Sequence, residues 1–447
     1  MIFNVDCIMA SDISRILNGI LYGNDCLIEN VSLNSKMMAK NTCFLAIKGK
    51  NFDGYNYIKE ALENGAKLII TDRYISLNSP YVLVDDVILA LGELAKFQSK
   101  GIKVIGITGS LGKTTVKNMV VSVLSQKYKV HGTEANENNE IGVPKTLLGA
   151  KNHDFCVVEM GMRGLGEIGY LASIALPTTV IVTNAKTSHI ERLKTKENIF
   201  LAKMEILKFE PQNAILPYEK RFIQYDYKKT SPIFVGDGSK CFASDIKVEN
   251  NSIKFKVFDS EKHSLEMKIY SKFMHNIQNA LFAYKVGKIY GLTDKQIKNG
   301  LESYKQESMR EEEIEVNGIT IINDSYNSAF ESLTSAVISV EKYANLVGKK
   351  FNVLIGDILE AGSDKKQLFE KVKKQLKHLN VKNVFVFNDE LTVMFGDLEN
   401  SFGANSYKEM AKIIYEKLDN NDILLVKASR GVGLERVIEE MKGMQNE

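Results

Sequence analysis

The sequence of 447 residues is poor in cysteine, with five in the whole chain. They are widely spaced, odd in number and never in a C-x-x-C pair: Cys7, Cys26, Cys43, Cys156 and Cys241. Disulfide frameworks and structural zinc sites need paired, closely spaced cysteines. The scarcity therefore argues against both and indicates a reducing compartment, the cytosol.

Long apolar runs are also lacking. No uninterrupted apolar stretch approaches the ~20 residues that a membrane-spanning helix needs. The N-terminal stretch MIFNVDCIMASDIS has neither the basic segment nor the long apolar run of a signal peptide. We therefore expect a cytoplasmic protein without stable membrane association.

An excess of one charge sign is missing as well. The chain has 58 Lys and Arg against 55 Asp and Glu, which gives a formal net charge of +3. A nucleic-acid-binding domain is normally clearly basic. The composition thus gives no support for a nucleic-acid partner, and we expect none.

The chain does contain the material for several hydrophobic cores. Hydrophobic residues make up 44% and charged residues 25% of it, as in a globular protein. A length of 447 residues exceeds what one core normally holds, so several domains are expected. Since only six prolines occur and no low-complexity linker is present, the domain limits must be inferred from the pattern of strands and helices.

The first hundred residues mix short strands with helices. CFLAIKG (43–49) and AKLIITD (66–72) are rich in apolar and β-branched residues and predict strands. The stretch 88–100 has helical spacing. We expect a small mixed α/β domain over residues 1–100.

A second pattern follows this domain. VIGIT (104–108) predicts a buried strand, a glycine-rich loop comes next, and 114–128 has the apolar stripe of a helix. Two further buried strands are predicted at 154–161 and 178–185. This alternation predicts a mainly parallel sheet of the mononucleotide-binding type, in a central domain over residues 101–313.

The alternation becomes regular in the last third of the chain. Strand-like segments recur at intervals of roughly thirty residues with helical segments between them, as in doubly wound domains. They are ITIIND (319–324), FNVLIGD (351–357), NVFVFND (383–389) and DILLVKAS (422–429). The repeat predicts a Rossmann-like C-terminal domain over residues 314–447.

The loop GITGSLGKTT (106–115) carries the strongest chemical signal. Its glycines stand three apart, with Gly109 and Gly112 closest to the helix, whereas the standard phosphate loop has four residues between Gly and Gly-Lys-Ser/Thr. Between a strand and a helix, backbone N–H groups and the positive end of the helix dipole bind phosphates. Lys113 would reach the terminal phosphates, and the Thr114 hydroxyl would bind Mg²⁺. The alternative is a turn that binds nothing, which the agreement of strand, loop and helix disfavours.

Three other residues carry weaker signals. Glu159 ends a predicted strand, where a carboxylate either holds a hard cation or is simply solvated. His189 follows another strand end, and a lone histidine is more often structural than a ligand. Lys203, in NIFLAKMEIL, has by itself the pattern of an ordinary helix lysine. None of the three establishes a metal site without further support.

Six motifs follow the loop in a fixed order: EANENNEIGVP, VVEMGMRGLGEI, TNAKTSHIERL, FLAKMEIL, HNIQNA and INDSYN. With the loop, this set resembles the Mur ligases, the ATP-dependent amide-forming enzymes of peptidoglycan precursor synthesis. The branch that joins D-alanyl-D-alanine to UDP-N-acetylmuramoyl-tripeptide is the most similar, on EMGMRGLGEI, NDSYN, LIGDILEAG and VKASRGVGLERV. The resemblance spans nearly the whole chain, since FLAIKGKNFDGYNYI resembles the N-terminal domain of that branch.

The resemblance implies an activity and its partners. The γ-phosphate of ATP passes to the terminal carboxylate of the UDP-sugar tripeptide, which gives an acyl phosphate and ADP. The amine of D-alanyl-D-alanine then attacks the carbonyl, and phosphate leaves. The three domains would hold the UDP-sugar, ATP with Mg²⁺, and the dipeptide in that order, in a monomer whose domains close to exclude water.

The resemblance also implies roles for individual residues. Those at the ATP phosphates are Gly109, Ser110, Gly112, Lys113, Thr114, Thr115 and Arg310, the last at the γ-phosphate. Those at the rest of the nucleotide are Asn276 and Asn279 beside adenine and Asp324 at the ribose. The implied substrate residues are Ser35, Lys36, Asn138, Asn139 and Asn327.

A metal set follows from the same resemblance. The implied Mg²⁺ ligands are Thr114, Glu159, His189 and Lys203. An ammonium cannot ligate a cation, so Lys203 is implied to be carbamylated, because a carbamate presents two anionic oxygens. The implied catalytic set is Lys113, Glu159, His189, Lys203 and Arg310.

Some segments depart from the family pattern. The N-terminal Ser/Thr-Arg ends here in Lys36, which loses a fork-shaped contact, and DGH becomes DGY at Tyr55. EGN becomes EAN at Ala135, and DSYNANP becomes DSYNSAF, with Ala329 and Phe330. Two alternatives therefore stay open beside this ligase: a paralogue that joins a different acid and amine, and a nucleotide-binding scaffold without ligase activity.

Overall fold

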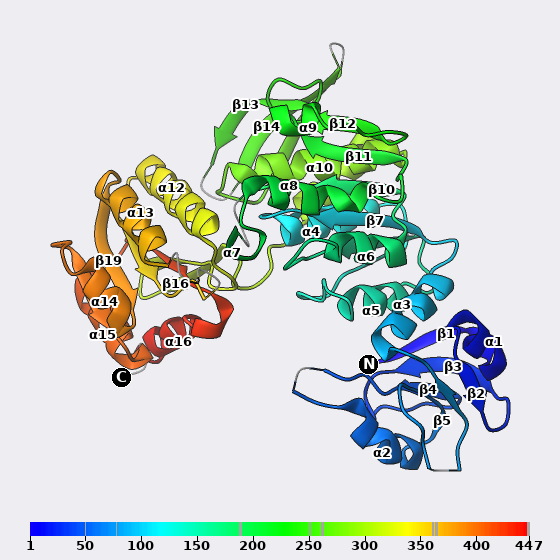
Figure 1. The fold of residues 1–447 in the computed structure, drawn as a ribbon. Coiled ribbons are helices and arrows are strands. Elements are labelled where there is room, and N and C mark those ends of the chain that lie inside the picture. The colour runs from blue at the N-terminus through cyan, green and yellow to red at the C-terminus, as the bar shows by residue number, and fades with distance from the viewer. Residues whose placement is uncertain are drawn as a thin grey trace. The chain divides into compact units, whose positions relative to one another are not determined.

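The computed structural model describes residues 1–49, 51–76, 78–186, 190–249, 252–260, 263–359, 362 and 365–444. The chain forms two compact units, whose elements are shown in Figure 1. Unit 1 comprises Met1–Asn184, Leu201–Cys241 and Leu281–Leu301, and unit 2 comprises Ala185–Phe200, Phe242–Ala280 and Glu302–Glu447. Among the described residues, no helix combines the length and the apolar character that a membrane crossing requires.

Unit 1 begins with a six-stranded mixed sheet in the order β1-β3-β4-β5-β6-β2. Its strands are β1 (Ile2–Met9), β2 (Ile20–Tyr22), β3 (Leu27–Ser32), β4 (Thr42–Leu45), β5 (Ala66–Thr71) and β6 (Tyr81–Leu83). Strands β3 to β6 run parallel, and β1 and β2 pair antiparallel at the two edges. The helices of this region are α1 (Ala10–Ile16), α2 (Ile58–Glu63) and α3 (Val87–Gln98). The small mixed α/β fold predicted for the N-terminal region is confirmed.

The second sheet of unit 1 is entirely parallel, in the order β12-β11-β10-β7-β9-β8. Its strands are β7 (Lys103–Thr108), β8 (Val130–Gly132), β9 (Phe155–Glu159), β10 (Thr179–Val182), β11 (Asn213–Pro217) and β12 (Ser231–Val235). Helices α4 (Lys113–Leu124), α5 (Gly142–Gly149), α6 (Glu167–Ala175) and α9 (Lys220–Ile223) connect them. Every residue of β9 and β10 is buried, as expected of parallel strands covered on both faces. The predicted parallel sheet is confirmed, and β10 is shorter than the segment 178–185 that the pattern suggested.

Unit 2 contains an antiparallel sheet that the sequence interpretation missed. Its strands are β13 (Phe242–Val248), β14 (Ile253–Ser260) and β15 (His263–Ile269). In β14 the apolar residues Ile253, Phe255 and Val257 are buried, and Lys254 between the first two is exposed. This period of two, visible in IKFKVF, is the signal of a strand with one buried face.

The last sheet of unit 2 has the order β16-β17-β21-β18-β19-β20, in which only the edge strand β16 is antiparallel. Its strands are β16 (Glu312–Val316), β17 (Ile319–Asn323), β18 (Phe351–Ile355), β19 (Val381–Phe387), β20 (Ser401–Ala404) and β21 (Ile423–Lys427). Its helices are α12 (Phe330–Val347), α13 (Lys365–Lys377), α14 (Asp389–Phe395), α15 (Tyr407–Lys417) and α16 (Glu435–Gly443).

Successive residues of these strands pack into two different hydrophobic cores, one on each face of the sheet. Val353 packs with α12, α13 and α14, whereas Leu354, the next residue, packs with α15 and α16. Helices therefore cover both faces of the sheet, and the predicted doubly wound Rossmann-like fold is confirmed.

Four more helices complete the description: α7 (Ile190–Leu193), α8 (Lys196–Met204), α10 (His275–Ile289) and α11 (Asp294–Ser303). The last three have residues in both compact units. The domain limits at residues 100 and 313 stay a prediction.

Candidate active site

The glycine loop lies between β7 and α4 in unit 1, and its backbone requires glycine at two positions. Gly112 has φ 77°, in the left-handed region, directly before the first helical residue. At Gly109, a Cβ atom would lie 1.9 Å from Thr183 Oγ1. Gly112 thus permits a conformation that L-residues avoid, and Gly109 permits a close approach between the loop and the residue that follows β10.

Two residues that the sequence analysis missed hold this loop in place. Thr183 Oγ1 and Asn184 Nδ2 donate to the carbonyl of Leu111 over 2.6 and 3.0 Å. The Leu111 N–H donates to Asn184 Oδ1, and the Ser110 N–H donates to the Asn184 carbonyl. The sequence signal for these two residues is the Thr-Asn pair in TTVIVTNA, which directly follows a strand that pairs with β7.

Lys113 folds back over the loop. Its Nζ donates to the carbonyl of Gly109 over 2.9 Å and to that of Ser110 over 3.4 Å. An ammonium in this position, at the N-terminus of a helix, adds positive charge where backbone N–H groups already favour an anion.

A buried oxygen-rich cluster lies beside the loop. Thr114 Oγ1 donates to Glu159 Oε2 over 2.8 Å, and Asn138 Nδ2 donates to Glu159 Oε1 over 2.8 Å. Thr114 and Glu159 are 3% and 2% exposed. A hydroxyl and a carboxylate in contact are hard oxygen donors of the kind that Mg²⁺ prefers. The solvated strand-end alternative for Glu159 is wrong, because the carboxylate is buried.

Glu159 is also positioned through its backbone by residues that the sequence analysis did not name. Its N–H donates to Thr133 Oγ1 over 2.9 Å. The carbonyl of Thr133 accepts from the buried amine of Lys117 over 2.6 Å. Lys117 lies three residues after Thr114, so α4 supports Glu159 from two successive turns.

Lys203 is 1% exposed, so its interpretation as an ordinary helix lysine is wrong. Burial holds the pKa of its amine well below the usual range, and the positive charge of Lys113 lowers it further. A neutral, unprotonated amine is the form that reacts with CO₂.

The other predicted metal ligand, His189, lies outside the described residues. Within the described part of the chain, no group of three or more His, Cys, Asp and Glu side chains is placed so that it could hold a metal ion. Of the four predicted Mg²⁺ ligands, the structure therefore describes Thr114, Glu159 and Lys203.

In unit 2, the start of α10 carries two buried asparagines. Asn276 and Asn279 are 1% and 6% exposed. Asn279 Nδ2 donates to Asn276 Oδ1 over 2.8 Å, and Asn276 Nδ2 donates to Ser271 Oγ over 2.8 Å and to Glu311 Oε2 over 3.1 Å. The two predicted adenine residues thus share one hydrogen-bond chain that ends on Glu311.

Arg310 sits between two residues with a left-handed backbone, Met309 (φ 59°) and Glu311 (φ 54°). Its guanidinium lies 4.1 Å from the centre of the Tyr326 ring, and Nε lies 3.4 Å from Glu307 Oε2. Non-glycine residues in this region carry backbone strain, which clusters at functional sites.

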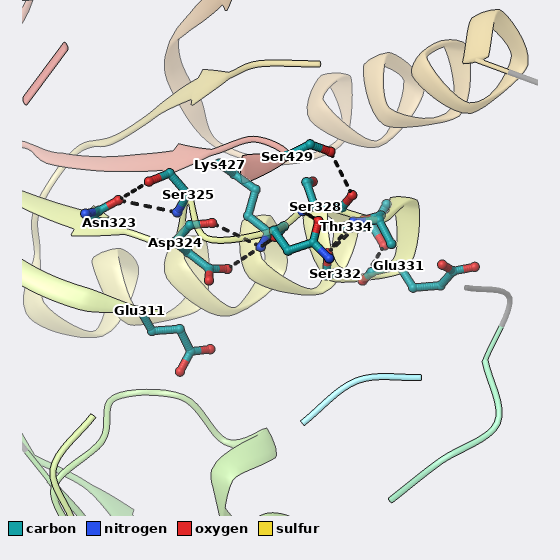
Figure 2. Close-up of polar contacts among 12 residues, drawn as sticks. Glu311, Asn323, Asp324, Ser325, Ser328, Glu331, Ser332, Thr334, Lys427 and Ser429 are labelled. Atoms are coloured by element: carbon teal, nitrogen blue, oxygen red, sulfur yellow. Dashed lines mark hydrogen bonds and ion pairs between the residues drawn. The ribbon is translucent and has the colours of Figure 1, made fainter. Parts of the chain in front are cut away.

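Figure 2 shows the cluster around Asp324, after β17. Lys427 Nζ, at the end of β21, lies 2.7 Å from Asp324 Oδ2 and donates to the carbonyls of Asp324 and Asn327 over 3.1 and 2.7 Å. Lys427 is 3% exposed on its side chain and Asp324 16%. Burial raises the pKa of the Asp324 carboxyl against the opposing effect of Lys427, and Glu311 adds to the rise. The ammonium organises the whole segment that follows β17.

The substituted residues after Asn327 begin α12. Phe330 is the first helical residue, and Ala329 precedes it as the N-cap. Ser332 Oγ accepts from the Ala329 N–H and donates to the Ala329 carbonyl, both over 2.8 Å. The serine hydroxyl satisfies backbone groups that the alanine side chain cannot reach.

Three sequence models describe successive parts of this chain. They are the Mur ligase family catalytic domain over residues 27–116, the Mur ligase middle domain over 107–287, and the Mur ligase glutamate ligase domain over 309–430. The chain belongs to the Mur ligase family.

Relatives and solved structures narrow the type. UDP-N-acetylmuramoyl-tripeptide–D-alanyl-D-alanine ligase of Bacillus subtilis is 31% identical over 93% of each chain. The enzyme of that name from Synechocystis is 31% identical over 93% of this chain and 92% of its own. A crystal structure of MurF from Acinetobacter baumannii superposes with a TM-score of 0.91 and 26% identity, over 98% of this chain and 100% of that one. MurF ligase from Thermotoga maritima in complex with ADP gives 0.83 and 28%, over 93% and 97%. This Mur ligase is of the MurF type.

Two further predicted substrate residues of this Mur ligase, Ser35 and Asn139, have structural partners of their own. Ser35 Oγ donates to Glu60, and Lys36 beside it is exposed. Asn139 Oδ1 accepts from the N–H of Gly142, at the start of α5. Tyr55 donates its hydroxyl to the carbonyl of Tyr74. Their roles toward substrates stay predictions.

Proposed function

We propose that this chain joins D-alanyl-D-alanine to UDP-N-acetylmuramoyl-tripeptide at the expense of ATP. The observation that carries the proposal is the glycine loop with its buried Thr114–Glu159 pair, in a chain that matches MurF-type ligases over almost its full length. Because a scaffold needs no buried carboxylate beside its phosphate loop, this arrangement favours catalysis over simple nucleotide binding.

The reaction proceeds in two steps. The terminal carboxylate of the tripeptide attacks the γ-phosphorus of ATP, which forms an acyl phosphate and releases ADP. The amine of D-alanyl-D-alanine attacks the acyl carbon, and phosphate leaves with the bonding electrons while the amine loses a proton. Phosphorylation is needed because a carboxylate itself has no competent leaving group.

Residues of unit 1 act on the phosphates. Lys113 and the N–H groups at the start of α4 stabilise the negative charge that grows on the transferred phosphoryl group. Gly109 and Gly112 let the backbone approach the nucleotide, and Ser110 and Thr115 flank them.

Mg²⁺ fits the oxygen donors beside the loop. Thr114, Glu159 and a carbamate on Lys203 would hold it, with His189 as a further ligand near the substrate carboxylate. When bound, the ion neutralises phosphate charge. The buried amine of Lys203 supports this assignment, since burial lowers its pKa well below the usual range and carbamylation needs an unprotonated lysine.

Residues of unit 2 also contact the nucleotide. Asn276 and Asn279 lie at adenine, Asp324 at the ribose and Arg310 at the γ-phosphate. Residues 1–100 bind the UDP-sugar with Ser35 and Lys36, residues 101–313 bind ATP, and residues 314–447 bind the dipeptide. Asn138, Asn139 and Asn327 complete the substrate set, in a monomer that works in the cytoplasm.

The test is a product assay with both substrates and each alone. Phosphate release should require ATP, the UDP-sugar tripeptide and D-alanyl-D-alanine together, and mass spectrometry should find the UDP-sugar pentapeptide. Slow ATP hydrolysis that ignores both substrates would instead identify a nucleotide-binding scaffold. Ligation of another acid or amine in preference, from a competing mixture, would identify a paralogue whose Lys36 and Tyr55 have changed its substrate choice.

A further inference from the structure

Glu311 follows Arg310 directly in unit 2, and its carboxylate collects three hydrogen-bond donors. His275 Nε2 lies 2.8 Å from Oε1, and Asn276 Nδ2 and Gln306 Nε2 donate to Oε2 over 3.1 and 2.9 Å. The side chain of Glu311 is 14% exposed, so water competes little for these contacts. The three donors lie on two separate segments of the chain.

An ionised carboxylate can only accept hydrogen bonds, and this fixes the orientation of the amides next to it. Asn276 must turn its NH₂ group toward Glu311, and its second N–H donates to Ser271 Oγ over 2.8 Å. Its carbonyl oxygen therefore faces Asn279, which must present its own NH₂ group over 2.8 Å. We call Glu311, Asn276 and Asn279 the amide relay.

The relay has a chemical consequence at its far end. Since Asn279 donates one N–H of its NH₂ group to Asn276, its carbonyl oxygen lies on the side away from the relay. Within the described part of the chain, the side-chain hydrogen bond of Asn279 is the one to Asn276. This oxygen can accept a hydrogen bond from a ligand. The 6-amino group of adenine can donate one, whereas the 6-oxo group of hypoxanthine is itself an acceptor.

We propose that Glu311 is a positioning residue that selects adenine. By fixing the polarity of the amide relay, it makes Asn279 present an acceptor and so favours a 6-aminopurine over a 6-oxopurine nucleotide. Glu311 acts through Asn276 and Asn279 and touches no nucleotide itself. The inference rests on the proposed function, which puts adenine beside these two asparagines.

The decisive variant is Glu311→Gln in the full-length chain. The amide has nearly the same size but brings its own donor, so Asn276 and then Asn279 are free to reverse. The preference for ATP over ITP, measured as the ratio of their kcat/KM values in ligation, should fall about tenfold, as expected for one mismatched polar contact. The KM for ATP should rise by a similar factor, and kcat at saturating ATP should change by less than about twofold.

Two matched variants separate polarity from packing. Glu311→Asp keeps an acceptor-only carboxylate although it shortens the side chain, so it should keep more of the ATP preference than Glu311→Gln. A purely structural role predicts the reverse order. Glu313→Gln makes the same chemical change two residues later, at a carboxylate that pairs with Lys272, and should leave both kinetic constants unchanged.

Each outcome decides a defined question. A wild-type protein that forms no product with ATP contradicts the proposed function. A wild-type ligase that uses ITP as well as ATP, or a folded Glu311→Gln that keeps the full ATP preference, contradicts the inference alone. Asn276→Leu breaks the relay one step later and must also relax the preference, so a poorly folded Glu311→Gln does not remove the test.

Discussion

Two buried lysines show how differently the two units use the same side chain. Lys203 of unit 1 is 1% exposed and has another positive charge, Lys113, near enough to lower its pKa. Lys427 of unit 2 is 2% exposed but lies on the Asp324 carboxylate and on two backbone carbonyls. Burial disfavours an ammonium, and Lys427 has partners in the described part of the chain that compensate for this cost.

The comparison teaches what each lysine is suited for. An amine whose pKa burial lowers is suited to react with CO₂, and a carbamate formed on it would reverse the charge of the position. An ammonium held by a carboxylate and two carbonyls is a structural cation that fixes the chain around it. Under the proposed function, Lys203 serves catalysis and Lys427 holds the segment around Asp324. Replacing Lys203 should therefore lower turnover, and replacing Lys427 should lower stability.

The largest effect is expected when Lys427 is replaced by Met. Asp324 would then be buried without its partner, which costs about 3–5 kcal/mol of unfolding free energy. Urea denaturation followed by circular dichroism measures this. The double variant Lys427→Met with Asp324→Asn removes both charges and should be clearly more stable than the single one. Equal stability of the two would show that the ion pair does not hold this segment.

Lys203→Ala addresses the other side of the comparison. Loss of the carbamate should lower kcat by about 10²–10³-fold while the protein stays folded, a magnitude typical of one lost charge-stabilising group. Short carboxylates such as acetate should restore part of the rate by occupying the vacated oxygen positions.

The control is Lys208→Ala, at an exposed lysine five residues further along. It should retain wild-type turnover. Near-normal turnover of Lys203→Ala in CO₂-depleted buffer would end the assignment of a carbamate, and Lys203 would then resemble Lys427 in having a structural role only.

Gly109→Ala tests the backbone side of the phosphate site. A Cβ atom there would lie 1.9 Å from Thr183 Oγ1, so the loop must shift. Strain of this kind costs about 1–3 kcal/mol, which corresponds to a rise in the KM for ATP of roughly 10- to 100-fold. Gly101→Ala is the control, because its φ of 88° brings strain but no atom lies within 4 Å. An equal change of the KM for ATP in both variants would show that the close approach at Gly109 is not its cause.

The smallest effect concerns pH at the amide relay. Burial lowers the pKa of His275, but Glu311 outweighs it and raises the pKa above the ordinary 6.5. Burial raises the pKa of the Glu311 carboxyl, but His275 outweighs this effect and lowers the pKa below the ordinary 4.5. Protonated His275 stabilises the fold below about pH 6.5, and this stabilisation is lost as pH rises through the raised pKa of His275. Ionised Glu311 stabilises the fold at higher pH, and this stabilisation is lost as pH falls through the lowered pKa of Glu311.

The contact therefore stabilises the fold most near pH 5.5. His275→Gln should lower the unfolding free energy there by less than about 1 kcal/mol, because the His275 side chain is 42% exposed, and should have no effect at pH 9. Urea titrations at the two pH values measure the difference. A larger cost at pH 9 than at pH 5.5 would reverse the assignment of the charged pair.

The same contrast explains what sequence could predict. The parallel sheet, the glycine loop, Thr114 and Glu159 lie in short contiguous segments, where strand, loop and helix each leave a local pattern. The partners of Asp324 and Asn276 lie 103 and 35 residues away in the chain, at Lys427 and Glu311. Their ordinary contexts, a strand end and a run of glutamates, carry no local sign of a distant partner.

Helix pattern alone also misjudged Lys203. Hydrophobic spacing in NIFLAKMEIL predicts a helix, but it does not say that a charged position will be covered by other elements. The antiparallel strands β13 to β15 were missed for a different reason. The period of two in IKFKVF is a local pattern that predicts a strand, but the interpretation did not use it.

The most direct test of the account follows the oxygen atoms of the acid substrate. The terminal carboxylate of UDP-N-acetylmuramoyl-tripeptide is labelled with ¹⁸O and ligated to D-alanyl-D-alanine with unlabelled ATP. An acyl phosphate predicts one labelled oxygen in the phosphate that is released and one retained in the new amide. Unlabelled phosphate alongside product formation would contradict activation of the carboxylate by ATP.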